Sequence, residues 1–285
     1  MLLLQQFYSI FLKRNIVSSA IIITFIFFQQ VHAQGNLLVT PKRVVFDGAK
    51  RSEELNLANI GNDSATYMIS FIQIRMKDDG SVETINEPDS DQNFADKYLR
   101  VFPRRITLGP NEAQTVKVQV TKTNELTQGE YRSHLYFRAV PNEKPLGEKE
   151  ASKDSSISVK LIPIFGISLP VIIRQGESTA KLNLSNISFN VEKDSTPSLK
   201  ITFNRTGNMS LYGDVTINYV SLNGKVTKVG NVKGMAVYTP NKERNLLLSL
   251  DKKSGINYHT GKLQIIYADD SSKPIKLAEA ELALR

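Results

Sequence analysis

SISVKLIPIFGISLPVII, residues 156–173, is the stretch that decides the fold. It is much longer than the usual strand of about 5–6 residues. Its start alternates strictly, so Ile157, Val159 and Leu161 point to one side and the polar residues between them to the other. Pro163 has no amide hydrogen, so the strand is expected to lie at a sheet edge or to step sideways there. The stretch therefore predicts a long β-strand.

Two interpretations of this strand remain open. A charged loop, PNEKPLGEKEASKDSS, leads into it and has almost nothing to bury. A long apolar edge behind such a loop invites aggregation unless a partner is meant to pair with it. The other interpretation is an ordinary last core strand of a sandwich, which is hydrophobic because both of its sides are covered.

Short strand patterns separated by turns continue on both sides of this stretch. In the first half they cover residues 37–46, 54–59, 67–72, 99–108, 115–120 and 131–139, with a polar, irregular segment at 77–97. In the second half they cover residues 199–203, 215–220, 246–248, 258–267 and 277–284. Pro41 interrupts the first pattern, which predicts an edge or sheet-switching strand. With no helical period anywhere in the mature chain, the spacing predicts an all-β protein of two immunoglobulin-like sandwiches.

Two tyrosines hold similar places in the two halves. Tyr131 precedes Leu135 in the first, and Tyr258 precedes Leu263 in the second. At such places a sandwich often has a tyrosine that hydrogen-bonds back across a strand corner. Two ordinary core aromatics are an equally good interpretation of the pattern.

The first 33 residues have the pattern of a secretory signal peptide. Lys13 and Arg14 precede an apolar run over 16–28, and residues 31–33 (VHA) form a small-residue cleavage site. The run is shorter than the roughly 20 residues that a membrane-spanning helix needs. We therefore expect an exported protein without stable membrane insertion.

Two domains are expected behind the signal peptide. Arg174-Gln175-Gly176-Glu177-Ser178 is the first polar, glycine-containing break after the long strand. We place an N-terminal domain over residues 34–174 and a C-terminal domain over residues 175–285, each large enough to bury a core of its own.

Composition limits the kinds of site that the chain can carry. It has no cysteine, which excludes a disulfide scaffold, a thiol nucleophile and a cysteine-based metal site. The net charge of +8 falls to +6 when Lys13 and Arg14 are removed with the signal peptide. Lysines and acids are interleaved rather than clustered, which indicates a mild preference for acidic partners and no nucleic-acid stripe.

The mature chain offers little for catalysis. Only His134 and His259 remain, one in each expected domain. There is no G-x-S-x-G elbow and no glycine-rich phosphate loop after a strand. Paired acids such as Asp89 and Asp91 lie in a polar loop, where solvated side chains are expected. We therefore predict that the protein is not an enzyme and uses no cofactor and no metal.

The sequence gives more support to a protein-binding site. The free edge of the long strand could add to another protein's sheet, with main-chain hydrogen bonds giving affinity and Ile157, Val159 and Leu161 filling pockets. Arg43 lies on an apolar strand broken by a proline. Its planar guanidinium suits a terminal carboxylate, and a solvated edge arginine is the alternative.

Several segments of the first half resemble the periplasmic chaperones of pilus and fimbria assembly, the PapD-like family. Residues 40–48, TPKRVVFDG, look like the family's opening strand. Residues 102–110, FPRRITLGP, followed by QTV at 114–116, look like its proline-arginine and turn segment. Residues 129–137, GEYRSHLYF, are similar to its sixth strand, and the charged loop and the alternating strand at 156–161 correspond in place to its subunit-donating loop and strand.

The resemblance implies a divergent, non-enzymatic periplasmic chaperone whose two immunoglobulin-like domains are set in a boomerang. Such a protein captures a secreted pilus- or fimbrial-type subunit that lacks its own last strand, and it donates Ile157, Val159 and Leu161 to complete the subunit's groove. Delivery of the subunit for surface assembly is implied as well. An outer-membrane assembly platform is a further implied partner, and self-association through the edge strand is left open.

The family holds the subunit's C-terminal carboxylate with two basic residues in the interdomain cleft. Arg43 matches the first of them. The second is a lysine late in the long strand, and alignment on Pro170 puts Phe165 at its position. Lys160 is the only basic residue within the run and stands several places too early, so it is a weak candidate. This departure implies a branch whose clients are not standard pilins.

A cell-envelope adhesin or structural protein of tandem sandwich domains is the alternative function. The two hypotheses differ at the long strand, which a chaperone exposes when free and a structural module keeps paired and buried. A secreted hydrolase is disfavoured because histidines are scarce and nucleophile motifs are missing.

Overall fold

A computed structural model describes residues 37–141, 164–191 and 196–284 of the chain. Within these ranges the regular elements are β-strands, apart from two short 3-10 helices, Asp96–Tyr98 and Thr123–Glu125. None of the helices in the described ranges has the length and apolarity to cross a membrane. The all-β prediction is confirmed.

Several sequence predictions concern residues outside the described ranges. They are the signal peptide at 1–33 and, in the long strand, Ile157, Val159, Lys160, Leu161 and Pro163.

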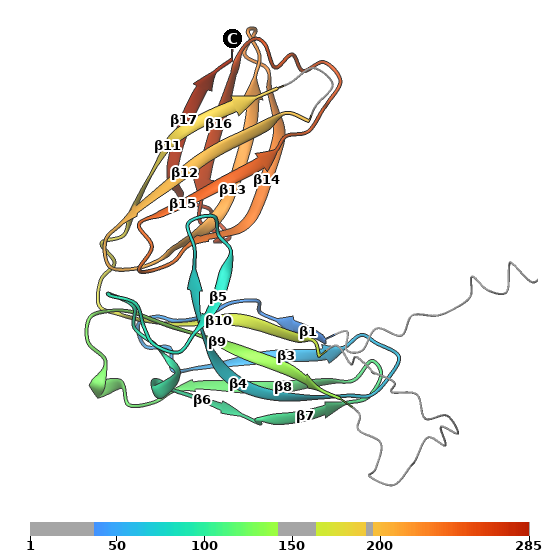
Figure 1. Cartoon of the computed structure of the whole chain (residues 1–285), viewed down its shortest axis with the longest axis vertical. Helices are drawn as coiled ribbons and strands as arrows, with labels where there is room; N and C mark the ends of the chain where they lie inside the picture. The colour runs from blue at the N-terminus through green and yellow to red at the C-terminus, as the bar shows by residue number, and fades with distance from the viewer. Residues whose placement is uncertain (1–36, 142–163, 192–195, 285) are drawn as a thin grey trace, which may run out of the picture.

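The first domain is a sandwich of two sheets (Figure 1). Its strands are β1 (Leu37–Thr40), β2 (Val44–Phe46), β3 (Ser52–Asn59), β4 (Ala65–Met76), β5 (Val82–Ile85), β6 (Leu99–Phe102), β7 (Arg105–Leu108), β8 (Ala113–Val120), β9 (Gly129–Val140) and β10 (Gly166–Gln175). One sheet has the order β1-β3-β8-β6, and the other has the order β2-β10-β9-β4-β5, with β7 also paired to β4.

Period-two alternation builds the core between these sheets. Leu55 and Leu57 on β3 are fully buried, and Asn56 between them faces solvent. Leu135 and Phe137 on β9, in the other sheet, are buried in the same core. Alternation therefore sets which face of each strand is inside, as the sequence predicts.

The opening strand changes sheets at Pro41. β1 pairs with β3, whereas β2 pairs with β10 in the other sheet. Since proline has no amide hydrogen, it cannot continue a ladder through this point. The predicted sheet switch is confirmed.

Three predictions for the middle of this domain are wrong. Residues 77–97 are not irregular throughout, because β5 pairs with the end of β4 to make a hairpin. Residues 99–108 form two strands in different sheets rather than one, and Pro103 lies between them. Asp89 is not a free loop acid, since Arg75 donates to it from Nε at 2.6 Å.

The second domain is also a sandwich. Its strands are β11 (Lys181–Asn190), β12 (Ser198–Thr206), β13 (Leu211–Val220), β14 (Val226–Val237), β15 (Glu243–Ser249), β16 (Lys262–Ala268) and β17 (Lys276–Ala283). They form the sheets β11-β12-β15 and β14-β13-β16-β17. Two immunoglobulin-like sandwiches are therefore present, as predicted, although the sequence patterns missed β11 and β14.

Both corner tyrosines hydrogen-bond as the sandwich fold predicts. The Thr127 amide donates to the Tyr131 hydroxyl at 3.0 Å. The Tyr258 hydroxyl donates to the Asp251 carbonyl at 2.8 Å. Each bond fixes the chain just before a central strand, so the hydrogen-bonding interpretation is confirmed over that of two plain core aromatics.

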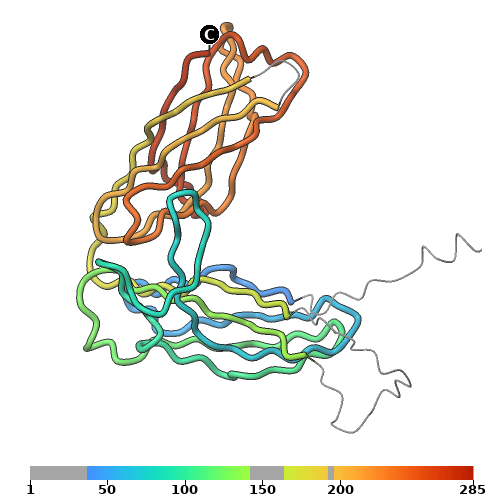
Figure 2. Tube along the Cα trace, in the orientation of Figure 1, coloured from blue at the N-terminus to red at the C-terminus, as the bar shows by residue number. Residues whose placement is uncertain are grey.

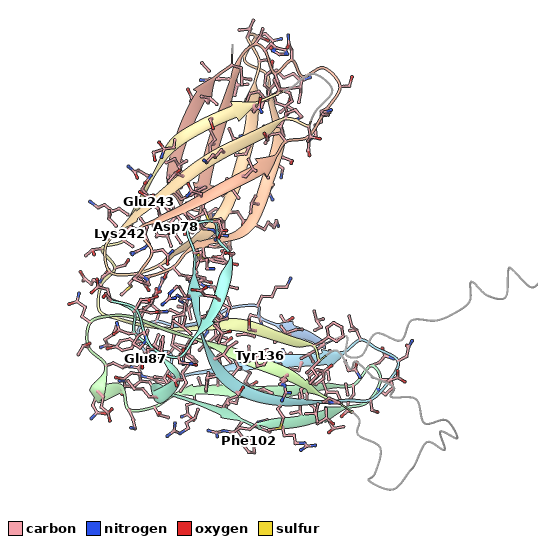
Figure 3. The ribbon with its side chains drawn as sticks, in the orientation of Figure 1. Asp78, Glu87, Phe102, Tyr136, Lys242 and Glu243 are labelled. Atoms are coloured by element: carbon pink, nitrogen blue, oxygen red, sulfur yellow. The ribbon has the colours of Figure 1, made fainter. Side chains whose placement is uncertain are left out.

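The two sandwiches meet at an angle and give the chain a bent, boomerang-like outline (Figures 1 and 2). The β4–β5 hairpin rises from the first domain to the base of the second. There the Asn245 amide donates to the Asp78 carbonyl at 2.5 Å, and Asn241 Nδ2 donates to the Met76 carbonyl at 2.9 Å. Figure 3 shows Asp78 beside Lys242 and Glu243 at this contact.

A small apolar cluster fills the junction between the domains. Its buried members are Met76, Ile172, Ala236 and Tyr238, and Val45 and Tyr212 pack against them. Strands β2, β4 and β10 of the first domain therefore share one core with β13 and the end of β14 in the second. This shared core, together with the hairpin, holds the angle between the sandwiches.

Candidate functional site

The first half of β10 has a strand partner on one side only. β9 pairs with it antiparallel over Gly166–Gln175. β2 pairs with it parallel over residues 171–173 alone. Among the described strands, none pairs with the second edge of residues 166–170, so the amide and carbonyl groups that point there are available to another chain.

Apolar side chains are exposed along this open part of the strand. Ile164 is 44% exposed, Phe165 52% and Ile167 39%. Leu169 and residues 171–173 are buried in the core. Both interpretations of the long strand thus hold, each for its own part: the second half is ordinary core, and the described residues before it form an exposed apolar edge.

Arg43 lies at the inner end of this open edge. It directly precedes Val44, which pairs with Val171, so it stands beside Pro170 where the unpaired edge ends. The Arg43 guanidinium lies over the Tyr212 ring, 4.4 Å from its centroid. The tyrosine belongs to β13, so both domains contribute to the site.

Within the described part of the chain, the Arg43 guanidinium has no counter-charge. Its Nε and Nη2 are buried and have no hydrogen-bond partner, and no described carboxylate forms an ion pair with it. A buried cation without an anion is costly, and the aromatic face compensates only part of the charge. Such a group is not a solvated edge arginine. It is suited to an anion that comes from outside.

A second arginine, Arg132, lies deeper in the junction. Its guanidinium stands over the Tyr238 ring at 4.3 Å, and Nη2 donates to the Thr239 carbonyl at 3.0 Å. Its Nε is buried without a partner. The junction therefore carries two arginines held by aromatic faces of the second domain rather than by carboxylates.

The histidines do not form a catalytic arrangement. His134 is buried beside Arg132, and burial together with that charge lowers the pKa of His134 to about 3. It is therefore uncharged at neutral pH. His259 is exposed in a loop of the other domain. No cluster of three acidic or histidine side chains that could hold a metal occurs within the described ranges.

The position expected for the second cation holds Phe165, which is not basic. Phe165 lies on the open apolar edge instead of pointing a charge into the junction, and Lys160 lies outside the described residues. Sequence reasoning missed Tyr212 and Tyr238, which form the second wall of the site. They come from a distant part of the chain, and no local pattern relates them to Arg43.

A buried ion pair fixes the two domains behind the site. The Glu130 side chain is fully buried and accepts from Arg174 Nε at 3.1 Å. Across the junction, the Ser210 amide donates to the same carboxylate at 3.0 Å, and Arg174 Nη2 donates to the Ser210 carbonyl at 2.7 Å. The two bonds to Ser210 cross the domain boundary, so they resist changes in the angle between the domains.

A polar cavity of about 540 Å³ also lies at the junction, lined by Glu130, Arg205 and Asn208 among others. Arg205 is nearly buried, but main-chain carbonyls already accept from its guanidinium, including those of Asn241 at 2.9 Å and Gly207 at 2.7 Å. The cavity therefore offers no uncompensated cation of the kind that Arg43 presents.

No family model and no curated protein matches the chain. Solved structures similar to it include three bacterial chaperones. The Pseudomonas aeruginosa CupB2 chaperone is 13% identical, with 87% of this chain and 100% of that chain covered, at a TM-score of 0.42. The E. coli chaperone DraB is 11% identical, with 88% and 97% covered, at 0.41. A chain of the Salmonella enterica SafA pilin complex with the SafB chaperone is 13% identical, with 88% and 98% covered, at 0.41.

Proposed function

We propose that the chain is a periplasmic chaperone that binds secreted pilus- or fimbrial-type subunits by donating an edge β-strand and delivers them for surface assembly. The observation that carries the proposal is the open apolar edge of β10, which ends at the uncompensated Arg43. The role needs no catalytic group. The sequence segments that resemble pilus chaperones imply the same role.

The geometry favours one direction for the bound strand. β2 runs parallel to β10 beyond the open edge. A partner strand in line with β2, running the same way, would bring its C-terminus to Arg43. A strand running the opposite way would bring its N-terminal ammonium group to the guanidinium. Repulsion between the two positive charges disfavours that arrangement. The partner is therefore a parallel strand whose terminal carboxylate pairs with Arg43.

Apolar side chains supply the affinity. Fully burying one large apolar side chain is worth roughly 1.5–3 kcal/mol. About half of each of the side chains of Phe165 and Ile167 is still exposed. Burying that surface against a partner strand would contribute about 2 kcal/mol in total, which corresponds to roughly a 30-fold change in Kd. By our proposal Ile157, Val159 and Leu161 continue the same alternating row into the subunit's groove.

The proposal extends to two further contacts. When no subunit is bound, the open edge would pair with a second copy of this chain, since an exposed apolar edge seeks a partner. A loaded chaperone would also dock on an outer-membrane assembly platform.

Isolation of the protein from the envelope fraction of its native cell tests the proposal. Three forms are compared with the wild type: Ile157, Val159 and Leu161 all changed to Asn, a Phe165→Asn/Ile167→Asn double variant, and a Leu222→Asn/Leu247→Asn control. Both control residues are exposed in the second domain. We expect a small secreted β-protein to accompany the wild type and the control in equal amount and to be lost from both edge variants.

The thermal unfolding of each variant separates binding from folding. Because Phe165 and Ile167 are exposed, their replacement should leave the unfolding temperature unchanged. If nothing accompanies the wild type and the edge variants unfold, the strand is core and the chaperone proposal fails.

A further inference from the structure

The open edge of β10 contains a glycine, Gly166, at a position where the backbone conformation does not call for one. Gly166 is not among the glycines with a positive φ, so other residues could adopt its conformation. A Cβ added there would collide with the end of the Tyr136 ring, including the hydroxyl oxygen. The glycine therefore leaves room for Tyr136, whose ring crosses β10 towards the open edge. A glycine inside a strand often marks a close approach of another group.

Among the described residues, none forms a hydrogen bond with the Tyr136 hydroxyl. Tyr136 lies on β9 and is partly exposed. Figure 3 shows it on the body of the first domain, away from Phe102 at the lower side. A hydroxyl placed over a glycine at an unpaired edge can donate to a group on the next strand.

Arg138 stands directly opposite Gly166 in the register of β9 and β10. It is exposed and forms no ion pair with the described residues. A strand added to β10 would lie roughly 10 Å from β9, twice the usual spacing of about 4.8 Å. The Tyr136 ring occupies the space over Gly166, and a long arginine side chain alongside the ring can cover much of that distance.

The face of the sheet on which these groups lie is strongly basic. The register places Arg43, Arg105, Arg132, Arg138 and Arg174 on it. Among the described strands of this sheet its one carboxylate is Glu130, which already pairs with Arg174. Arg132 is buried at the domain junction and Arg174 is paired, so a partner along this face meets Arg43, Arg105 and Arg138, which favour acidic groups.

We propose that Gly166, Tyr136 and Arg138 form a subsite for an acidic side chain on the strand that pairs with β10. The inference rests on the proposed function, because it specifies the strand that the open edge receives. Gly166 is four residues before Pro170, which stands beside Arg43. Because Arg43 takes the place beside Pro170, a parallel strand in line with β2 ends beside Leu169, and its acidic residue beside Gly166 is the fourth from the C-terminus. Its carboxylate accepts from the Tyr136 hydroxyl and pairs with Arg138.

Synthetic peptides test the subsite on the mature chain. Three strand-forming peptides share one alternating apolar sequence with a free C-terminal carboxylate and carry Asp, Asn or Lys at the fourth position from the end. Binding is measured by fluorescence anisotropy at low and high salt. We expect the Asp peptide to bind about fivefold more tightly than the Asn peptide, as for a good surface ion pair, and the Lys peptide to bind most weakly. The differences should shrink in high salt.

Matched variants assign the preference to residues. Arg138→Gln should remove most of the preference for Asp over Asn, and Tyr136→Phe should reduce it while keeping the ring. Arg100→Gln, which replaces an exposed arginine on the other sheet, should leave it unchanged. Gly166→Ala should weaken all three peptides, because the added methyl group displaces the Tyr136 ring.

Failure of the subsite can be told from failure of the proposed function. If the three peptides bind equally, or if the Asp preference survives Arg138→Gln, the subsite is refuted and strand pairing stands. If none of them binds at any salt concentration, the pairing itself is refuted, and the subsite with it. A peptide with an amidated C-terminus checks the register, since its binding should weaken through loss of the contact with Arg43.

Discussion

The buried ion pair at the domain junction allows one prediction to be worked out in detail. In a Glu130→Ala variant the Arg174 guanidinium and the Ser210 amide lose their shared carboxylate. The Glu130 side chain is completely buried, whereas that of Arg174 is 20% exposed. Removing one partner of a buried pair costs about 3–5 kcal/mol, and the partial exposure of Arg174 places the expected loss near the lower end.

The loss should appear in the coupling of the two domains. Unfolding in denaturant is followed by circular dichroism, since the chain has no tryptophan. We expect Glu130→Ala to lower the free energy of unfolding by about 3 kcal/mol, with the second domain unfolding separately from the first where the wild type unfolds as one unit.

Glu281→Ala is the matched control. It breaks the ion pair of Lys262 with Glu281, which is exposed on the second domain. Exposed pairs are generally worth about 0–1 kcal/mol. If Glu130→Ala costs no more than Glu281→Ala, the junction is not held by this pair, and the argument that the structure fixes the angle between the domains is refuted.

Three further predictions concern single residues. Arg43→Gln should abolish subunit retention yet leave the unfolding temperature equal or higher, because an uncompensated buried cation is removed; a lower temperature would contradict this. Burial and Arg132 lower the pKa of His134 to about 3, so as pH falls below the unfolded value of about 6.5 the unfolded chain binds a proton that the folded chain does not. Stability should fall by up to about 1.4 kcal/mol per pH unit, and His134→Gln should flatten this dependence. Tyr131→Phe and Tyr258→Phe should each cost about 1 kcal/mol in denaturant unfolding, and no loss in either would refute the corner assignment.

Most of the fold follows from local rules that the sequence displays. Strict alternation at 115–120 predicts β8 because a half-buried strand needs period two. Pro41 predicts the switch between sheets because it lacks an amide hydrogen. The tyrosine corners follow from the places of Tyr131 at the start of β9 and Tyr258 just before β16.

The elements that escaped prediction have interrupted patterns or depend on distant pairing. β11 carries a bulge at Asn186, whose φ is 49°, and this breaks its alternation. β14 contains Gly234 with a positive φ and register shifts against β13. β5 is four residues long and is held by the end of β4.

Part of the candidate site can likewise be predicted from the sequence, and part of it cannot. The apolar row and Arg43 can be recognised from local pattern. The partners of Arg43 cannot, because Tyr212 lies on the other domain and approaches only through the junction angle. The space at Gly166 becomes visible only when the Tyr136 ring is in place. Contacts of this kind depend on register and domain placement, which a single sequence does not state.

The central claim is that the open edge of β10 holds the last strand of a secreted subunit, and site-specific crosslinking tests it most directly. A photo-crosslinking residue replaces Ser168, which is exposed on the open part of β10, and Leu222 in the second domain serves as the control position. After irradiation in the native cell, mass spectrometry identifies the joined peptide. The account predicts that position 168, and not 222, joins the C-terminal residues of a secreted β-protein. Crosslinks from position 168 only to this chain's own residues, or none at all, would contradict it.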